Sequence, residues 1–264
     1  MKKGDKICFI SVDVEHDHGS EHAKTFHGAE RMDEILDIFG REGISSTLFV
    51  TGEVLERYPD KIRKWAQNHE IGCHSYSHTF FDLVHVSHIR EELERFVNLY
   101  KKTLSTAPKG FRAPSHIIDN AAIRTVSDAG FCYDSSVVPH YLPLKKYRGY
   151  LGGAPKTPYY PSEISYKKAG DMDLLELPVT GHLLGVPLAG AWIRGLPFSV
   201  YQFLFALHKP RYISFSFHSW DMFHDKRFTA KFSKMLDLLR KQGYQFKRGE
   251  EIANEYISKN RKQK

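Results

Sequence analysis

One stretch of the sequence, EIGCHSYSH (residues 70–78), joins an apolar segment to two histidines four positions apart. Residues 70–73 read as the end of a short buried strand, so His74 and His78 would follow directly after it. On a helical turn this spacing would place both imidazoles on one face, where both rings can reach one metal ion. A chain with 15 histidines contains about one such pair by chance, so the pair needs support from the rest of the sequence.

Strand-like and helical segments alternate on both sides of this stretch. The strand-like segments lie at residues 7–13, 46–52, 70–75, 108–115, 131–137, 173–181 and 211–220. The helical patterns lie at residues 29–43, 53–69, 87–104, 119–129, 197–209 and 231–243. In 264 residues without a linker, this alternation predicts one domain of parallel βαβ units, either a barrel or a doubly wound sheet. A disordered tail is expected over residues 258–264.

The composition narrows the class of protein. Hydrophobic residues make up 41% of the chain and charged residues 26%, as in ordinary soluble globular proteins. The three cysteines, Cys8, Cys73 and Cys132, lie in apolar contexts and predict neither disulfides nor a cysteine metal site, which fits a reducing compartment. The apolar run near the start is too short for a signal peptide, so a cytoplasmic protein is expected.

Charge and one apolar segment bear on the partners. The net charge of +7 suits anionic partners or a membrane surface, although the terminal lysines read as a solvated tail, and no nucleic-acid partner is expected. Residues 183–208 are apolar and aromatic, with Arg194 as their one strong charge, and their prolines and glycines argue against a transmembrane helix. The segment is expected to be core and barrel helix, or else a surface hairpin that contacts a membrane or a lipid-linked sugar at the inner membrane surface.

Polar residues follow several predicted strands at their carboxyl ends. They are Asp13 and Glu15, His74 and Ser75, Arg112-Ala113-Pro114, Asp134-Ser135-Ser136, and His218. Active sites of parallel α/β folds gather at this edge of the sheet. Five segments far apart in the sequence are therefore predicted to meet at one rim.

Two histidines and one carboxylate are typical of a catalytic zinc-type site, where the ion lowers the pKa of a bound water. His74, His78 and an acid of the first strand would supply the ligands, and a second acid would act as base toward the water. The alternative places the metal at another pair, His18 and His22, with His16 and Asp17 beside it.

These segments resemble the motifs of the polysaccharide deacetylase family, carbohydrate esterase family four. Its first motif is matched by SVDVEHD (11–17), its second, H-[ST]-x-x-H, by HSYSH (74–78), its third, R-x-P, by RAP (112–114), and its last by SFH (216–218). The resemblance spans roughly residues 7–220. It implies a distorted (β/α)7-type barrel, a single domain over residues 1–264, and metal-dependent removal of an acetyl amide or ester from a sugar or glycan precursor.

The resemblance also implies a role for each matched residue. Asp13 would be the base, Arg112 would orient it and lower its pKa, and His218 would protonate the leaving group. The metal and a backbone N–H would stabilise the oxyanion. The expected metal ligands are Glu15, His74 and His78, and the expected substrate contacts are Pro114, Phe217 and Trp220. Zn²⁺ suits these ligands best, and Co²⁺, Ni²⁺ and Fe²⁺ also fit.

The first motif departs from the family's commonest form, which has two adjacent aspartates. Here Asp13-Val14-Glu15 stands in its place, and Asp17 is an alternative ligand. Glu15 is favoured because residues 13 and 15 of a strand point to the same face. The family's fourth motif, with an aspartate and a tryptophan, is not clear; Asp134 and Glu176 are the nearest candidates.

Other interpretations stay open. The chain could be a catalytically silent carbohydrate-binding relative, or a hydrolase of a non-sugar amide or formamide. Asp13 could be a strand-end cap, Arg112 a structural ion-pair partner, and His218 a buried core histidine. The joint presence of a base, metal acids, an arginine and a late histidine argues against the silent relative. The sequence does not indicate the sugar, the acyl group or the oligomeric state.

Overall fold

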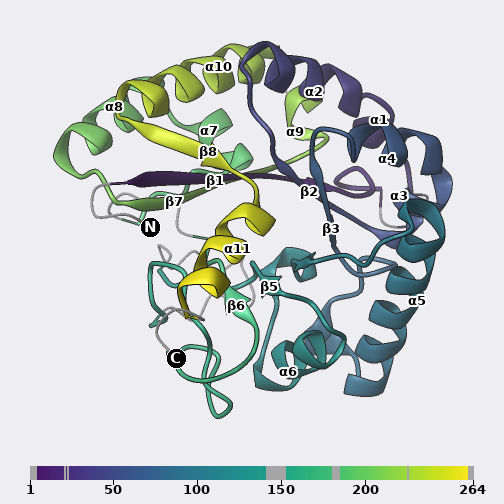
Figure 1. Ribbon diagram of the computed structural model, residues 1–264. Helices are drawn as coiled ribbons and strands as arrows, with labels where there is room; N and C mark the ends of the chain where they lie inside the picture. Colours follow the sequence, from purple (N-terminus) through teal and green to yellow (C-terminus); the bar gives the residue numbers. More distant parts are fainter. Residues whose placement is uncertain are drawn as a thin grey trace.

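The strand-like segments form one curled parallel sheet, shown in the computed structural model of Figure 1. The structure describes residues 5–20, 22, 24–140, 153–179, 185–224 and 226–260. The strands are β1 (Lys6–Val14), β2 (Thr47–Val50), β3 (Glu70–Cys73), β4 (Gly110–Phe111), β5 (Tyr133–Asp134), β6 (Leu175–Glu176), β7 (Tyr212–His218) and β8 (Tyr244–Lys247).

Most helices lie against the outer face of this sheet, and the last helix lies at the amino-terminal ends of the strands. They are α1 (His27–Glu30), α2 (Met32–Arg41), α3 (Gly52–Arg57), α4 (Pro59–Trp65), α5 (Val86–Leu104), α6 (Asn120–Asp128), α7 (Gly190–Gly195), α8 (Phe198–Leu207), α9 (Asp221–His224), α10 (Lys226–Lys241) and α11 (Gly249–Asn260). Two 3-10 turns, η1 (Phe81–Leu83) and η2 (Pro114–His116), follow β3 and β4.

The sheet order is β6-β5-β4-β3-β2-β1-β7, and every pairing is parallel. β1 pairs with β7 along most of its length, while β8 pairs with its first half and β2 with its second half. The predicted (β/α)7-type barrel is confirmed, in the form of a curled sheet whose ends, β6 and β7, do not pair with each other among the described residues.

Several predicted boundaries are wrong. The strands expected at 108–115, 131–137 and 173–181 contain only two paired residues each, because the polar residues after β4 and β5 leave the ladder to bond with one another. Residues 180–181 lie outside the described residues. The helix expected at 53–69 is two helices, because Pro59 lacks the N–H that would continue α3 and instead begins α4.

Two apolar clusters hold these layers together. The larger lies between the sheet and the outer helices, and the smaller fills the inside of the curled sheet with Phe9, Phe49 and Tyr133. α11, the yellow helix in Figure 1, crosses the amino-terminal end of the strands. Its Ile252 and Ala253 belong to this inner cluster. The helix therefore covers one end of the sheet, and the carboxyl ends of the strands stay available for a site.

The apolar segment expected to be either core or a membrane hairpin forms α7 and α8. α8 buries Tyr201 and Phe205 but leaves Phe203 62% and Leu207 59% exposed. Residues 183–184 lie outside the described residues. Among those described, no helix is both long enough and apolar enough to cross a membrane. Of the expected tail, residues 258–260 belong to α11 and residues 261–264 lie outside the described residues.

Candidate active site

The polar residues at the carboxyl ends of the strands meet around one cavity of about 580 Å³. Four of these side chains line it: Asp13 on β1, Glu15 directly after β1, His78 in the loop after β3, and His218 at the end of β7. The parallel register explains this, since Asp13 pairs directly with His218 and with Phe49. The predicted convergence on one rim is therefore observed for these four side chains.

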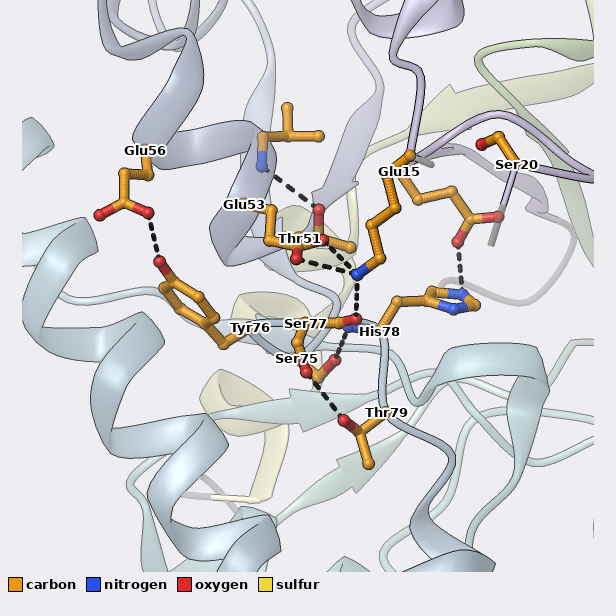
Figure 2. Close-up of polar contacts among 12 residues, drawn as sticks. Glu15, Ser20, Thr51, Glu53, Glu56, Ser75, Tyr76, Ser77, His78 and Thr79 are labelled. Carbon is orange, nitrogen blue, oxygen red and sulfur yellow. Dashed lines mark hydrogen bonds and ion pairs between the residues drawn. The ribbon is translucent and has the colours of Figure 1, made fainter. Parts of the chain in front are cut away.

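Glu15, His74 and His78 form a compact group of possible metal ligands. Their ligand atoms all lie within 4.8 Å of one another. Among the residues that the structure describes, no other set of three or more His, Cys, Asp or Glu residues is this compact. Oε2 of Glu15 lies 2.6 Å from Nε2 of His78 and 3.2 Å from Nε2 of His74. Figure 2 shows the Glu15 side chain reaching toward the His78 ring.

The geometry of the HSYSH stretch differs from the predicted helical turn. Residues 74–78 form a loop in which Ser75 and His78 have left-handed backbones, with φ of 59° and 63°. The Oγ of Ser75 accepts a hydrogen bond from the backbone N–H of His78 and closes this turn. Left-handed residues other than glycine are costly, and they cluster at functional sites. The loop brings the two rings together, with centroids 5.3 Å apart, without a helix.

A hydrogen bond at Nδ1 of His74 determines that Nε2 is the ring nitrogen free to bind a metal ion. Nδ1 lies 2.8 Å from the carbonyl oxygen of Arg112 and must donate to it, so the neutral ring presents the Nε2 lone pair to Glu15. This outer hydrogen bond is typical of a metal-binding histidine. Burial disfavours the charged form of Glu15, but the charge of His78 and the close approach of both imidazoles hold its pKa well below the ordinary value.

Asp17, the alternative ligand, has a structural role in this geometry. Its Oδ1 accepts from the N–H of Gly28, and its Oδ2 accepts from the N–H of His27 and the hydroxyl of Thr25. Both oxygens are occupied in fixing the loop that leads into α1. His18 stacks on Trp220, with ring centroids 5.4 Å apart, and the described residues do not gather His18 and His22 into a ligand group.

Asp13 is buried and paired with Arg112. The guanidinium Nη1 lies 2.7 Å from Oδ1 of Asp13, and Arg112 also donates to Ser11 and to Ser135 while it covers the Phe49 ring. Burial raises the pKa of the Asp13 carboxyl, but the Arg112 charge, with nearby histidines, outweighs this and lowers it. The carboxylate is thus ionised and held in place, as a base requires.

His218 is held by an aspartate whose role the sequence reasoning missed. Oδ2 of Asp221 accepts the backbone N–H of His218 at 2.8 Å and lies 3.4 Å from its Nδ1. Oδ1 of Asp221 lies 2.6 Å from Nη1 of Arg194 on α7. Burial lowers the pKa of His218, but the Asp221 hydrogen bond and the charges of Glu15, Asp221 and Asp13 raise it to about 9.

A glycine makes room for this aspartate. A Cβ on Gly190, the first residue of α7, would lie 1.9 Å from Oδ2 of Asp221. The sequence contained a usable signal, because a lone arginine in an apolar segment requires a partner carboxylate when it folds inward. Arg194 and Asp221 are that pair.

The two candidates for the fourth motif lie beneath the site instead of in it. Asp134 and Glu176 are both fully buried and pair side by side on β5 and β6. Burial raises the pKa of both carboxyls, and the Asp134 charge raises that of Glu176 further. Asp134 accepts from Ser136, which in turn accepts from the backbone after Arg112, so the pair supports the Arg112 segment.

Two of the three expected substrate contacts line the cavity, and the third does not. Phe217 and Trp220 line the cavity, and Trp220 stacks on His218 with ring centroids 4.4 Å apart. Pro114 is buried at the start of η2 and is absent from the lining. His116, two residues later and unnoticed in the sequence, lines the cavity instead; burial lowers its pKa to about 3, so its ring is neutral.

Comparison with known proteins agrees with this geometry. The sequence profile described as "Polysaccharide deacetylase" matches residues 10–133. The similarity to the polysaccharide deacetylase family thus covers a little under half of the chain. A peptidoglycan deacetylase of Helicobacter pylori is 24% identical over 180 residues, which cover 61% of this chain and 57% of that protein. Aligned parts cover 23% to 57% of the lengths of the curated relatives.

Solved structures share the fold of this chain. A candidate polysaccharide deacetylase from Mycobacterium smegmatis superposes with a TM-score of 0.69 and 18% identity, over 98% of this chain and 93% of that one. A pseudoenzyme of carbohydrate esterase family four from Bacillus anthracis superposes with a TM-score of 0.59 and 14% identity, over 95% and 66% of the two chains.

Proposed function

We propose that this protein is a metal-dependent deacetylase that hydrolyses the acetyl amide, or ester, of a sugar or glycan precursor. Similarity to this family supports a hydrolase of amide bonds acting on an acetylated glycan. The observation that carries the finer assignment is the ionised, arginine-held Asp13 in the same cavity as the Glu15–His74–His78 group.

The residues of that group suit a divalent metal ion. Oε2 of Glu15 is buried without a hydrogen-bond donor, and both histidines direct Nε2 toward it. Two imidazoles and a carboxylate suit Zn²⁺ first, and Co²⁺, Ni²⁺ and Fe²⁺ as well. When bound, such an ion would polarise the acyl oxygen and make a water molecule more acidic.

The side chains around the group then divide the proton transfers. Asp13 takes a proton from the attacking water, whose oxygen bonds to the acyl carbon, while Arg112 keeps the carboxylate ionised and aimed. His218, protonated and held by Asp221, gives its proton to the sugar nitrogen as the carbon–nitrogen bond breaks. The products are acetate and the free amino sugar, or the free alcohol for an ester.

Acetate release tests the proposal. We expect wild-type protein to release acetate from a panel of acetylated sugars, to lose this activity with a chelator, and to regain it with Zn²⁺. Asp13→Asn should lower kcat by at least about a hundredfold, because general base catalysis is typically worth that much. Asp60→Asn, on an exposed aspartate of α4, is the matched control and should keep full activity.

Unchanged turnover in Asp13→Asn would overturn the role of Asp13 as base. Absence of acetate release from the whole panel, with Zn²⁺ present, would favour a silent relative, as in the family pseudoenzyme, or a non-sugar amide as substrate. The cavity is lined by Asp13, Glu15, His78 and His218, while Arg112 and His74 contact Asp13 and Glu15 from behind; this complete set favours the active enzyme.

We also propose that the protein works in the cytoplasm, peripherally at the inner membrane surface. Phe203 and Leu207 lie one turn apart on the exposed side of α8, and the exposed cations Lys209 and Arg211 follow them. Washing membranes with high salt and then mild detergent should release protein in both steps. Full recovery in the soluble fraction without either treatment would remove this proposal.

A further inference from the structure

The two sides of the cavity differ in chemistry because different parts of the curled sheet supply them. β1 and the segments after β3 and β4 supply polar side chains. The opposite side lies at the open edge between β6 and β7. There, residues 188–190 run along β7, with the Ser216 N–H donating to the carbonyl oxygen of Leu188 and a parallel bridge between Ala189 and Ser216.

Six lining residues from this open edge form what we call the apolar wall: Val138, Val179, Pro187, Ala189, Ala191 and Trp192. Val138 and Val179 follow β5 and β6, and a hydrogen bond from the Val179 N–H to the carbonyl oxygen of Val137 places these two segments side by side. Five of the six side chains contain no polar atom at all. The wall itself therefore offers almost no side-chain hydrogen bonds to a ligand. Two polar side chains, His140 and Arg194, line the cavity beside it, and Arg194 is paired with Asp221.

Glu15 and His78 of the metal-binding group line the same cavity as the wall, so a substituent on a substrate that reacts at the group can reach the wall. The volume of about 580 Å³ is within the range of small-molecule pockets. A sugar hydroxyl placed against the wall would lose its hydrogen bonds to water and gain none. An alkyl or aryl group in the same place would be stabilised by its burial.

We infer that the substrate is an N-acetylated amino sugar that carries an alkyl or aryl aglycone, and that the apolar wall binds this aglycone. The inference rests on the proposed deacetylase function and deepens it by naming the substrate class. Unsubstituted oligosaccharides would react more slowly, because further sugar units would place hydroxyl groups against the wall.

A series of N-acetylglucosamine derivatives tests the inference in the Zn²⁺-loaded protein. The methyl, hexyl and phenyl β-glycosides, chitotetraose, and the methyl glycoside with an N-hexanoyl in place of the N-acetyl group are compared for kcat/KM. Each buried methylene is worth about fourfold in affinity. We expect the hexyl glycoside to exceed the methyl glycoside at least tenfold, and to exceed chitotetraose.

Two variants locate the effect. Trp192→Ala should lower the hexyl-to-methyl ratio at least fivefold, because it removes the largest side chain of the wall. Phe203→Ala, on the exposed side of α8 and outside the cavity, is the matched control and should leave the ratio unchanged. Circular dichroism and thermal unfolding of both variants show whether they are folded.

Binding measured by calorimetry in parallel separates the two proposals. Tighter binding of the hexyl than of the methyl glycoside without hydrolysis of either would sink the deacetylase function and support the wall. Hydrolysis with equal kcat/KM for the methyl and hexyl glycosides, or faster hydrolysis of chitotetraose, would overturn the inference and leave the deacetylase function standing. A preference for the N-hexanoyl over the N-acetyl compound would also overturn it, since the wall would then bind the acyl chain.

Discussion

At the scale of single residues, the site is defined by what each neighbouring acid touches. Asp13, Glu15 and Asp17 are two residues apart along the chain, yet one pairs with an arginine, one with two histidines and one with backbone N–H groups. The alternation of strand side chains explains the first two. Glu15 directly follows the last residue of β1 and still keeps the alternation, whereas Asp17 lies two residues further along the loop, so only the structure shows that it fixes the loop into α1.

These different contacts predict different responses to metal. A ligand present at a thousand times its Kd stabilises a folded protein by about 4 kcal/mol, so saturating Zn²⁺ should raise the free energy of unfolding of wild-type protein by that order. Glu15→Gln should abolish this increase. Asp17→Asn should keep it, while lowering the stability of the metal-free protein by about 1 kcal/mol through lost loop hydrogen bonds.

The measurement is thermal unfolding of each variant with chelator and with Zn²⁺. The two variants control each other, because each replaces one carboxylate by the matching amide. A metal-dependent shift that persists in Glu15→Gln and disappears in Asp17→Asn would mean that the ligand assignment is wrong.

At the scale of elements, the sequence predicts which segments are strands better than it predicts where they end. The buried strands β2, β3 and β7 lie inside their expected segments, and β1 extends one residue beyond its segment at each end. Continuous apolar runs that pack on both faces explain this agreement. β4, β5 and β6 are much shorter than expected, since their ladder contacts are limited to one or two residue pairs each. Such short pairings depend on the neighbouring strands and leave no pattern of their own.

The loop that carries His74 and His78 could not be predicted for a related reason. Its spacing suggested a helical turn, but Ser75 and His78 adopt left-handed backbones, which residues other than glycine adopt uncommonly. Contacts with the rest of the fold impose this conformation, among them two backbone N–H groups of the loop, of Tyr76 and Ser77, that donate to the buried Glu92. The ligand residues were predictable from sequence, and the path between them was not.

The start of α7 provides a prediction at this scale. Gly190→Ala places a Cβ against the buried Asp221 carboxylate, so it should lower stability by about 1 to 3 kcal/mol and reduce acetate release by displacing the partner of His218. Gly195→Ala, at the other end of the same helix, has open space around the new Cβ and is the matched control.

Urea unfolding and acetate release of the two variants check this expectation. Gly195→Ala should change stability by less than about 1 kcal/mol and leave the activity as it is. Equal behaviour of the two variants would show that the space at Gly190 is not needed for the Asp221 position.

At the scale of the whole molecule, α11 is joined to the sheet through a buried acid far from the site. Glu70 at the start of β3 accepts from the hydroxyls of Thr47 and Tyr133 and from the N–H of Glu250 on α11. Burial, with the charge of Glu250, raises the pKa of Glu70 to about 7 in spite of these hydrogen bonds. The folded protein thus binds this proton more tightly than the unfolded chain does.

A raised carboxyl pKa makes stability fall as pH increases. The contribution of Glu70 is fully present below the ordinary glutamate pKa of about 4.5, and about 3 kcal/mol of it is lost by the time the pH exceeds about 7. Glu70→Gln removes this dependence, because the amide oxygen can still accept from Thr47 and Glu250 while its NH₂ donates to Tyr133. Urea unfolding between pH 4.5 and pH 8 should show a smaller decrease for the variant than for wild-type protein. Parallel curves would contradict the raised pKa.

The position of α11 has a consequence for how the chain is made. Three aromatic residues of the inner cluster, Phe9, Phe49 and Tyr133, come from the first 133 residues of the sequence, whereas Ile252 and Ala253, which cover them, come from the last helix. Until the ribosome has added the final residues, α11 is absent and these aromatic rings remain exposed to solvent. The nascent protein therefore needs protection from aggregation until its synthesis is nearly complete, and chaperone dependence should be greatest for chains truncated just before Gly249.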